Sequence, residues 1–139
     1  IKMLKKCVFS LVYILPLNLY AAQVDELREQ AIHTYKTGQT QQAILQLDQL
    51  LNKYPHDQKL LADYLFIMSS EKRDLTNFSR FLVNINYVDF PEYAKLPLIQ
   101  NFRDFKHFKT AIDWSKKFNI QNSKFKIYKY IISLFFNYS

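Results

Sequence analysis

Apolar positions recur along most of the chain with the spacing of amphipathic helices. From residue 24 onward an apolar or small side chain returns every three or four positions, beginning with Leu27, Ala31, Thr34 and Tyr35. A second stripe follows at Ala43, Ile44, Leu47, Leu50 and Leu51. Gly38 separates the two stripes, where a left-handed residue is needed to end a helix, and Pro55 ends the second stripe. The pattern predicts a helical hairpin over residues 24–57, with Thr40 and Asp57 as N-caps.

The hairpin pattern returns twice without a gap, over residues 58–91 and again over 92–125. In the second repeat the first helix is expected to carry Leu60, Leu61, Tyr64, Leu65 and Met68, and the second, opened by Asp74, to carry Leu75, Phe78, Phe81 and Leu82. The third repeat places Leu98, Ile99, Phe102 and Phe105 on its first helix and Phe108, Ala111, Ile112, Ser115 and Phe118 on its second. Pro97 predicts that the first helix of the third repeat begins late or kinks. We therefore expect an all-α fold, an antiparallel helix-hairpin array of about three units after an N-terminal signal helix.

The repeat length and the hairpin division resemble the tetratricopeptide repeat. The residues that carry this resemblance are Ala31, Gly38, Ala43, Leu51 and Pro55, with Ala111 at the position of Ala43 in the third repeat. Small residues let the helices of a unit approach closely, and large residues fill the space beside the next unit. The second repeat departs from the motif, because it has Asn77 at the small position and no glycine at its turn. A helical hairpin array of another kind is the alternative.

The first 22 residues resemble an export signal. Lys5 and Lys6 precede the apolar stretch 7–17, and the small residues Ala21 and Ala22 follow it before the first acid, Asp25. Cleavage is expected after Ala21 or Ala22, which would place residues 23–125 in the periplasm and leave a mature chain without cysteine. The alternative is an uncleaved inner-membrane anchor, although the uncharged stretch 7–22 is shorter than the ~20 residues that span a bilayer.

The tail is basic, aromatic and apolar toward its end. Residues 123–139 read SKFKIYKYIISLFFNYS, which supplies only the start of a fourth repeat and no polar capping helix. We interpret residues 126–139 as a truncated or frameshifted end. A basic amphipathic segment at a membrane surface is the alternative.

Composition argues against several classes of chemistry. The single glycine excludes dinucleotide and P-loop sites, and no HExxH or GxSxG motif occurs. We expect a non-enzymatic protein with no metal and no cofactor. The net charge of +7 and the lysines among the C-terminal aromatics could attract nucleic acid, but an export signal argues against that partner. We predict Tyr64, Tyr93 and Trp114 as contacts for a sugar or a peptide.

Residues 22–122 also resemble the periplasmic start of the outer-membrane porin family that exports poly-β-1,6-N-acetyl-D-glucosamine, a biofilm polysaccharide. The similarity lies in the signal followed at once by repeats, in LLADYLFI over 60–67, and in LPLIQNFRDFKHFKTAIDWSKKF over 96–118. The resemblance implies a periplasmic tetratricopeptide module that binds a polysaccharide deacetylase or the partly deacetylated polymer. It also implies an N-terminal fragment, since the C-terminal barrel of that family is missing here. The alternative function is an inner-membrane-anchored scaffold that recruits another protein.

Overall fold

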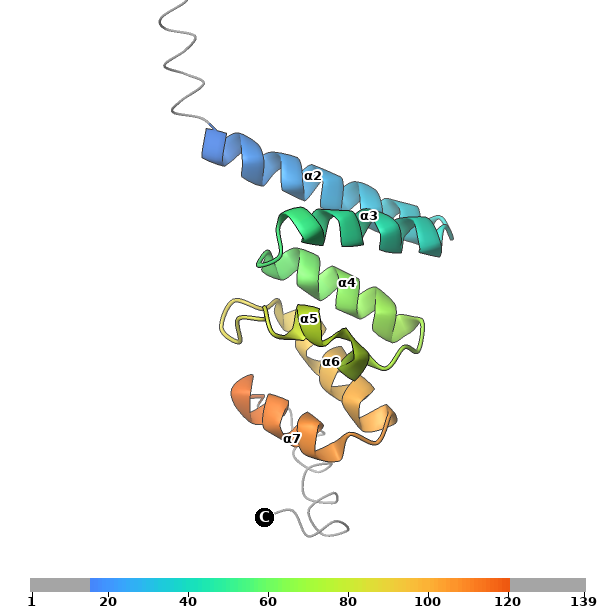
Figure 1. Cartoon of the computed structure of the whole chain (residues 1–139), viewed down its shortest axis with the longest axis vertical. Coiled ribbons are helices and arrows are strands. Elements are labelled where there is room, and N and C mark those ends of the chain that lie inside the picture. Colours follow the sequence, from blue (N-terminus) through green and yellow to red (C-terminus); the bar gives the residue numbers. More distant parts are fainter. Residues whose placement is uncertain (1–15, 121–139) are drawn as a thin grey trace, which may run out of the picture. The chain divides into compact units, whose positions relative to one another are not determined.

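The computed structural model describes residues 16–120, and every regular element within this range is a helix (Figure 1). In chain order these are α2 (Pro16–Lys36), α3 (Thr40–Lys53), α4 (Gln58–Ser70), the 3₁₀ helix η1 (Leu75–Phe78), α5 (Ser79–Leu82), α6 (Glu92–Asp104) and α7 (Phe108–Lys117). The expected all-α fold class is therefore confirmed. Residues 1–15 of the predicted signal and the predicted tail 126–139 lie outside the described residues, and the predicted boundary after residue 22 falls within α2.

The described part of the chain divides into two compact units, with the boundary after Asn52. In the N-terminal unit, α2 and α3 form an antiparallel pair joined by the short turn 37–39 (Figure 1). The pair buries Val24, Ala31, Ala43, Leu47 and Leu51. Both alanines are fully buried, as expected for small residues that allow two helices to approach closely.

The first turn confirms one capping prediction and corrects another. Gly38 has a φ of +89°, the left-handed conformation predicted for the residue that ends α2. Thr40, in contrast, is the first residue of α3 rather than its N-cap. The carbonyl of Gln39 accepts the first helical hydrogen bond, from the Ala43 amide at 3.0 Å, so the predicted position was wrong by one residue.

In the C-terminal unit, α4 packs against α6 and α6 packs against α7, while η1 contacts α4 and α6 (Figure 1). Asp57 caps α4 as predicted, because its carboxylate accepts a hydrogen bond from the Leu60 amide. The core of this unit includes large apolar side chains from α4 and α6, namely Leu61, Leu65, Ile67, Leu98, Ile99 and Phe102. Each of these side chains is almost completely removed from water, so most of the apolar stripe predicted for α4 and α6 forms their packed faces. Phe105 is the exception, because it follows the last residue of α6 and is 37% exposed.

The turn that ends the first helix of each repeat has the same conformation three times. Gly38, Lys72 and Lys106 stand at the same position of the three repeats, and the two lysines have φ values of +57° and +64°. Each turn has the same hydrogen bonds, since the amide after the left-handed residue returns to a helical carbonyl: Gln39 to Thr34, Arg73 to Met68 and His107 to Phe102. This is the Schellman arrangement. The same turn also follows α7, a second helix, where Asn119 has a φ of +51° and the Ile120 amide donates to the Ser115 carbonyl. The turn therefore recurs at 34-residue intervals after the three first helices without being confined to them.

The helix positions follow the same period. The two first helices α4 and α6 have 13 residues each, and they begin at Gln58 and Glu92, which are equivalent positions of the second and third repeats. Ala43 and Ala111 are each the fourth residue of their helix, and each amide donates to the carbonyl of the residue that precedes the helix. Both alanines are buried, at 0% and 1% exposure. The two alanines therefore occupy equivalent local positions, as the sequence register requires.

The second helix of the second repeat departs from the prediction. Asp74 opens it as expected, but the segment forms the four-residue η1 and the four-residue α5 instead of one continuous helix. Asn77, at the position of Ala43, is exposed. A polar side chain there provides no buried contact that would hold a longer helix against its neighbours.

Of the two effects expected of Pro97, a late start or a kink, the late start is wrong. The helix begins at Glu92 and contains Pro97 at its sixth position. An internal proline costs about 3 kcal/mol because a helical hydrogen bond is lost. Burial of Leu98, Ile99 and Phe102 in the same helix offsets that cost, because each fully buried side chain contributes about 1.5–3 kcal/mol.

Candidate binding surface

Tyr64, one of the three predicted contact residues, belongs to the core. Its side chain is 4% exposed. Its ring packs on Phe81 at a centroid distance of 4.7 Å and on the edge of Phe78 at 6.1 Å. The structure therefore places this tyrosine where it stabilises the fold and offers little surface to a ligand.

Tyr93, the second predicted contact residue, lies on the surface of α6 with 54% of its area exposed. Its hydroxyl donates a hydrogen bond of 2.5 Å to Oδ1 of Asp63 on α4, and Asp63 is itself buried. Because the bond joins two neighbouring helices, it fixes the orientation of an exposed aromatic ring. A ring held in this way loses little conformational freedom when a partner binds to it.

Asp63 and Tyr93 belong to a stripe that runs along the two first helices of the C-terminal unit. On α4 the stripe continues one turn later to Phe66, which is 41% exposed. On α6 it continues from Tyr93 to half-buried Pro97 and exposed Gln100, since residues four and seven positions apart lie on one side of a helix. We call these five residues the first-helix face. It combines accessible apolar area with hydrogen-bonding groups, a composition suited to an extended chain.

Trp114, the third predicted contact residue, is half-buried in a cluster of aromatic rings. Its ring lies 5.3 Å from Tyr87, 5.5 Å from Phe118 and 5.7 Å from Phe102. The ammonium of Lys117 lies 5.6 Å from the Trp114 ring centroid. These contacts assign Trp114 a packing role between α6, α7 and the segment before α6, in a different ring cluster from Tyr64.

Most of the residues predicted for repeat packing are inaccessible to solvent. Ala31, Ala43, Leu51 and Ala111 are buried, and Gly38 forms the left-handed turn. Pro55 is exposed in the short connection between α3 and α4.

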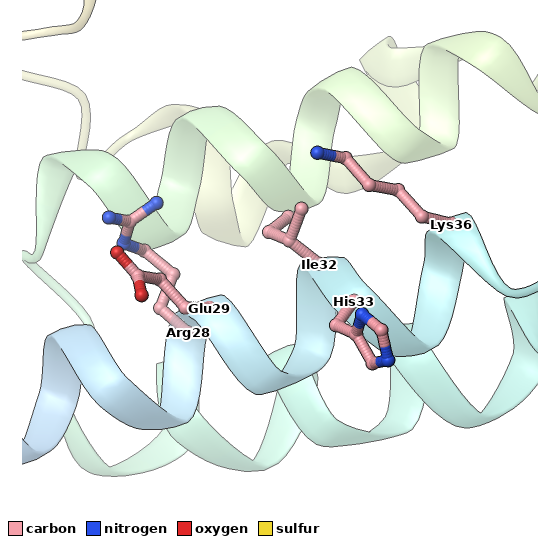
Figure 2. A pocket seen from close by; sticks show the side chains of 5 residues that line it. All are labelled: Arg28, Glu29, Ile32, His33 and Lys36. Atoms are coloured by element: carbon pink, nitrogen blue, oxygen red, sulfur yellow. The ribbon is translucent and has the colours of Figure 1, made fainter.

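A pocket of about 330 Å³ lies along α2 in the N-terminal unit. Figure 2 shows the side chains that line it, which project from successive turns of the helix: Arg28, Glu29, Ile32, His33 and Lys36. Glu29, Ile32 and Lys36 occupy the positions in the first repeat that Asp63, Phe66 and Ser70 occupy in the second. Two of the five pocket residues, Glu29 and Ile32, thus stand at positions that the first-helix face also uses.

A polar cluster joins two of the helix starts in the C-terminal unit. Nε2 of His107 lies 2.8 Å from Oδ2 of Asp74, and the Thr76 hydroxyl donates to Oδ1 of Asp74 at 2.7 Å. Burial raises the pKa of Asp74, but hydrogen bonds from His107 and Thr76 outweigh it, so the pKa lies below the ordinary value of 3.8. The ionised carboxylate therefore caps η1 and ties it to the start of α7.

This cluster does not have the arrangement of a catalytic triad. In a triad the hydroxyl donates to one imidazole nitrogen while the other nitrogen donates to the carboxylate. Here Nε2 of His107 faces both groups, at 3.3 Å from the Thr76 hydroxyl and 2.8 Å from Asp74. The hydroxyl proton is already given to Asp74, so Thr76 is not activated as a nucleophile.

The described residues contain neither a cluster of metal ligands nor a helix that could span a membrane. Within residues 16–120, no three His, Cys, Asp or Glu side chains converge as ligands for a metal ion. In the same range, none of the helices has both the length and the apolar character needed to cross a bilayer.

Sequence reasoning missed Asp63 and Phe66 because both stand among the core residues of their helix. The signal that separates them is the repeat itself, since the residues at these two positions change in chemical character from one repeat to the next. They are Glu29 and Ile32 in the first repeat and Pro97 and Gln100 in the third.

No family model, curated protein or solved structure matches this chain.

Proposed function

We propose that this chain is a non-enzymatic binding module of the tetratricopeptide type, whose first helices present the partner-binding side chains. The observation that carries the proposal is the left-handed turn that recurs at Gly38, Lys72 and Lys106. Three matching turns end three first helices in the same sequence register. Glu29 and Ile32 of the α2 pocket then fall at the positions that Asp63 and Phe66 occupy in the first-helix face.

The exposed residues at these positions support binding better than catalysis. Phe66 and Tyr93 supply exposed aromatic area, and the bond between Tyr93 and Asp63 orders it. Preorganised aromatic rings are the residues that contribute most at protein interfaces and that stack on sugars.

We further propose, from the resemblance to the poly-N-acetylglucosamine export porins, that the module is exported to the periplasm and acts at the outer membrane in biofilm polysaccharide export. Its partner is then a polysaccharide deacetylase or the partly deacetylated polymer. The alternative is a scaffold anchored in the inner membrane through its N-terminal segment. Sequencing the N-terminus of exported protein separates the two, because a start at Ala22 or Gln23 supports export with cleavage and an intact Met3 supports the anchor.

Binding by the first-helix face can be tested with matched surface variants. Phe66→Ser and Tyr93→Ser remove the exposed rings, while Val88→Ser removes an apolar side chain that is 87% exposed on a loop. Circular dichroism verifies that each variant folds, and calorimetry measures binding to the purified deacetylase and to a partly deacetylated β-1,6-N-acetylglucosamine oligosaccharide. We expect the first two variants to weaken binding about tenfold, equivalent to about 1.4 kcal/mol, and Val88→Ser to bind like wild type. Equal affinities for all four proteins would overturn the assignment of this face.

A further inference from the structure

The α2 pocket has a charge pattern that selects among ligands. Its rim carries the cationic side chains of Arg28 and Lys36 and the imidazole of His33, against one carboxylate, Glu29. Arg28 lies 3.7 Å from Asp25, an ion pair within α2. Within residues 16–120, no hydrogen bond or ion pair links the side chains of His33 and Lys36 to other side chains. The cationic end of the pocket is therefore available to a ligand.

The pocket is also ordered along the helix. Glu29 and Lys36 are seven residues apart, which corresponds to about 10 Å at 1.5 Å per residue. Ile32 lies between them and offers an apolar contact (Figure 2). An extended peptide covers that distance with about three residues. One acidic side chain can then reach Lys36 and His33 while an apolar side chain two residues away covers Ile32.

We propose that the α2 pocket binds an extended acidic peptide segment of the protein partner, with a carboxylate held by Lys36 and His33 and an apolar side chain placed on Ile32. This inference rests on the proposed binding function and names the chemistry of the partner. A cationic, partly deacetylated polymer is disfavoured at the end of the pocket where His33 and Lys36 lie, because its amines would meet the ammonium of Lys36 there. Within the proposed function, the pocket thus favours the protein over the polymer.

Three fluorescent probes of equal length test the proposal with the full chain. One alternates Asp with Leu, one Gln with Leu and one Lys with Leu, and binding is followed by anisotropy. We expect the Asp–Leu peptide to bind more tightly than the Gln–Leu peptide, and the Lys–Leu peptide to bind most weakly. Lys36→Glu should weaken binding of the Asp–Leu peptide about fivefold, because reversal removes an exposed ion pair and adds a repulsion. The difference should shrink at about 1 M salt, where the screening length falls to about 3 Å.

The matched control is Lys116→Glu, which makes the same change of charge in the last turn of α7. Both lysines lie near a helix C-terminus, where a cation stabilises the helix dipole, so both reversals carry the same local penalty. Lys116→Glu should leave peptide affinity unchanged, and circular dichroism verifies that both variants fold.

The outcomes separate this inference from the proposed function. If Lys36→Glu and Lys116→Glu bind the Asp–Leu peptide equally, or if the Gln–Leu peptide binds as well as the Asp–Leu peptide, the acidic-peptide site is wrong while the first-helix face stands. A partly deacetylated oligosaccharide that binds Glu29→Gln more weakly than wild type would also overturn it in favour of the polymer. If none of the peptides or oligosaccharides binds and Phe66→Ser has no effect on partner binding, the proposed function itself fails.

Discussion

The recurring left-handed turn leads to a prediction in which glycine and lysine exchange roles. Gly38→Ala should destabilise the protein, whereas Lys72→Gly and Lys106→Gly should stabilise it. A Cβ added at Gly38 meets no atom within 4 Å, so the cost of the alanine comes from the backbone alone. An L-residue in the left-handed conformation costs about 1–2 kcal/mol. Alanine recovers roughly 0.4–1 kcal/mol by restricting the unfolded chain.

The net effect of Gly38→Ala is therefore a loss of about 1 kcal/mol, since φ at this residue, +89°, lies well beyond the favoured left-handed value. At Lys72 and Lys106 the same two contributions act in reverse. Glycine removes the left-handed strain at φ values of +57° and +64° but enlarges the unfolded ensemble, which leaves a gain of about 0.5 kcal/mol for each. Lys109→Gly, in the first turn of the helix α7, is the control and should lose up to about 1 kcal/mol.

Thermal and urea unfolding of the full chain, followed by far-ultraviolet circular dichroism, measures these differences. A change of about 1 kcal/mol shifts the midpoint of a domain of this size by roughly 4–8 °C. The reasoning fails if Gly38→Ala is neutral or stabilising, or if Lys106→Gly is as destabilising as Lys109→Gly. Either result would mean that the three turns do not share one conformation in solution.

Three further predictions follow from buried contacts. Asp74 has a lowered pKa in the folded protein, so the stability it contributes is complete above the unfolded pKa near 3.8 and is lost as the pH falls through the lower, folded pKa. Asp74→Asn should therefore reduce the decrease in the urea-unfolding midpoint that accompanies acidification from about pH 6 to about pH 2. Asn101→Leu should cost roughly 2–3 kcal/mol in urea unfolding at neutral pH, because it leaves the Leu75 amide and the Arg73 carbonyl without the partners that the asparagine provides at 3.0 Å and 2.8 Å. Ala111→Leu should lower the free energy of unfolding by about 1–3 kcal/mol through overpacking. Asn77→Leu, at the equivalent but exposed position of the second repeat, should alter it by less than about 0.5 kcal/mol.

Local patterning was enough to locate most of the helices but not all of the turns between them. Gly38 predicts the first turn, because glycine is the usual residue at a left-handed position. Lys72 and Lys106 give no such signal, since lysine has no preference for that conformation. Their φ values follow from the helices on both sides, whose packing fixes where the chain must reverse. The second and third turns were therefore predictable only from the register of the first.

The same limit explains the two errors in helix extent. Pro97 predicts a late start for α6 on local grounds, yet the buried residues that follow it hold the helix in register from Glu92. Asn77 is unremarkable within a helix by propensity, yet at the position of Ala43 it leaves the second helix without a buried anchor. In both cases tertiary packing decided against the local preference.

Aromatic residues showed where sequence reasoning could not separate core from surface. Tyr64 and Tyr93 were equal candidates, because each is an aromatic residue on the expected first helix of a repeat. The two residues differ in helix phase, which places Tyr64 against Phe81 and leaves Tyr93 exposed and bonded to Asp63. Which side of each helix faces the core depends on how α4 and α6 pack, and the spacing of apolar residues alone does not specify that packing.

Comparison among the repeats supplies the information on function that a single sequence otherwise lacks. Positions with the same environment at 34-residue intervals, such as Ala31, Leu65 and Ile99 at 0–1% exposure, serve the packing of the helices. The more accessible position next to them changes from Ile32 to Phe66 to Gln100, although the helices that carry it are equivalent. Core packing does not explain why the residue type changes at this position, because these side chains contribute less to the core. The varied positions are therefore where selection for a partner can act without loss of the fold, which is why the binding residues are sought on the first helices and not in the buried stripe.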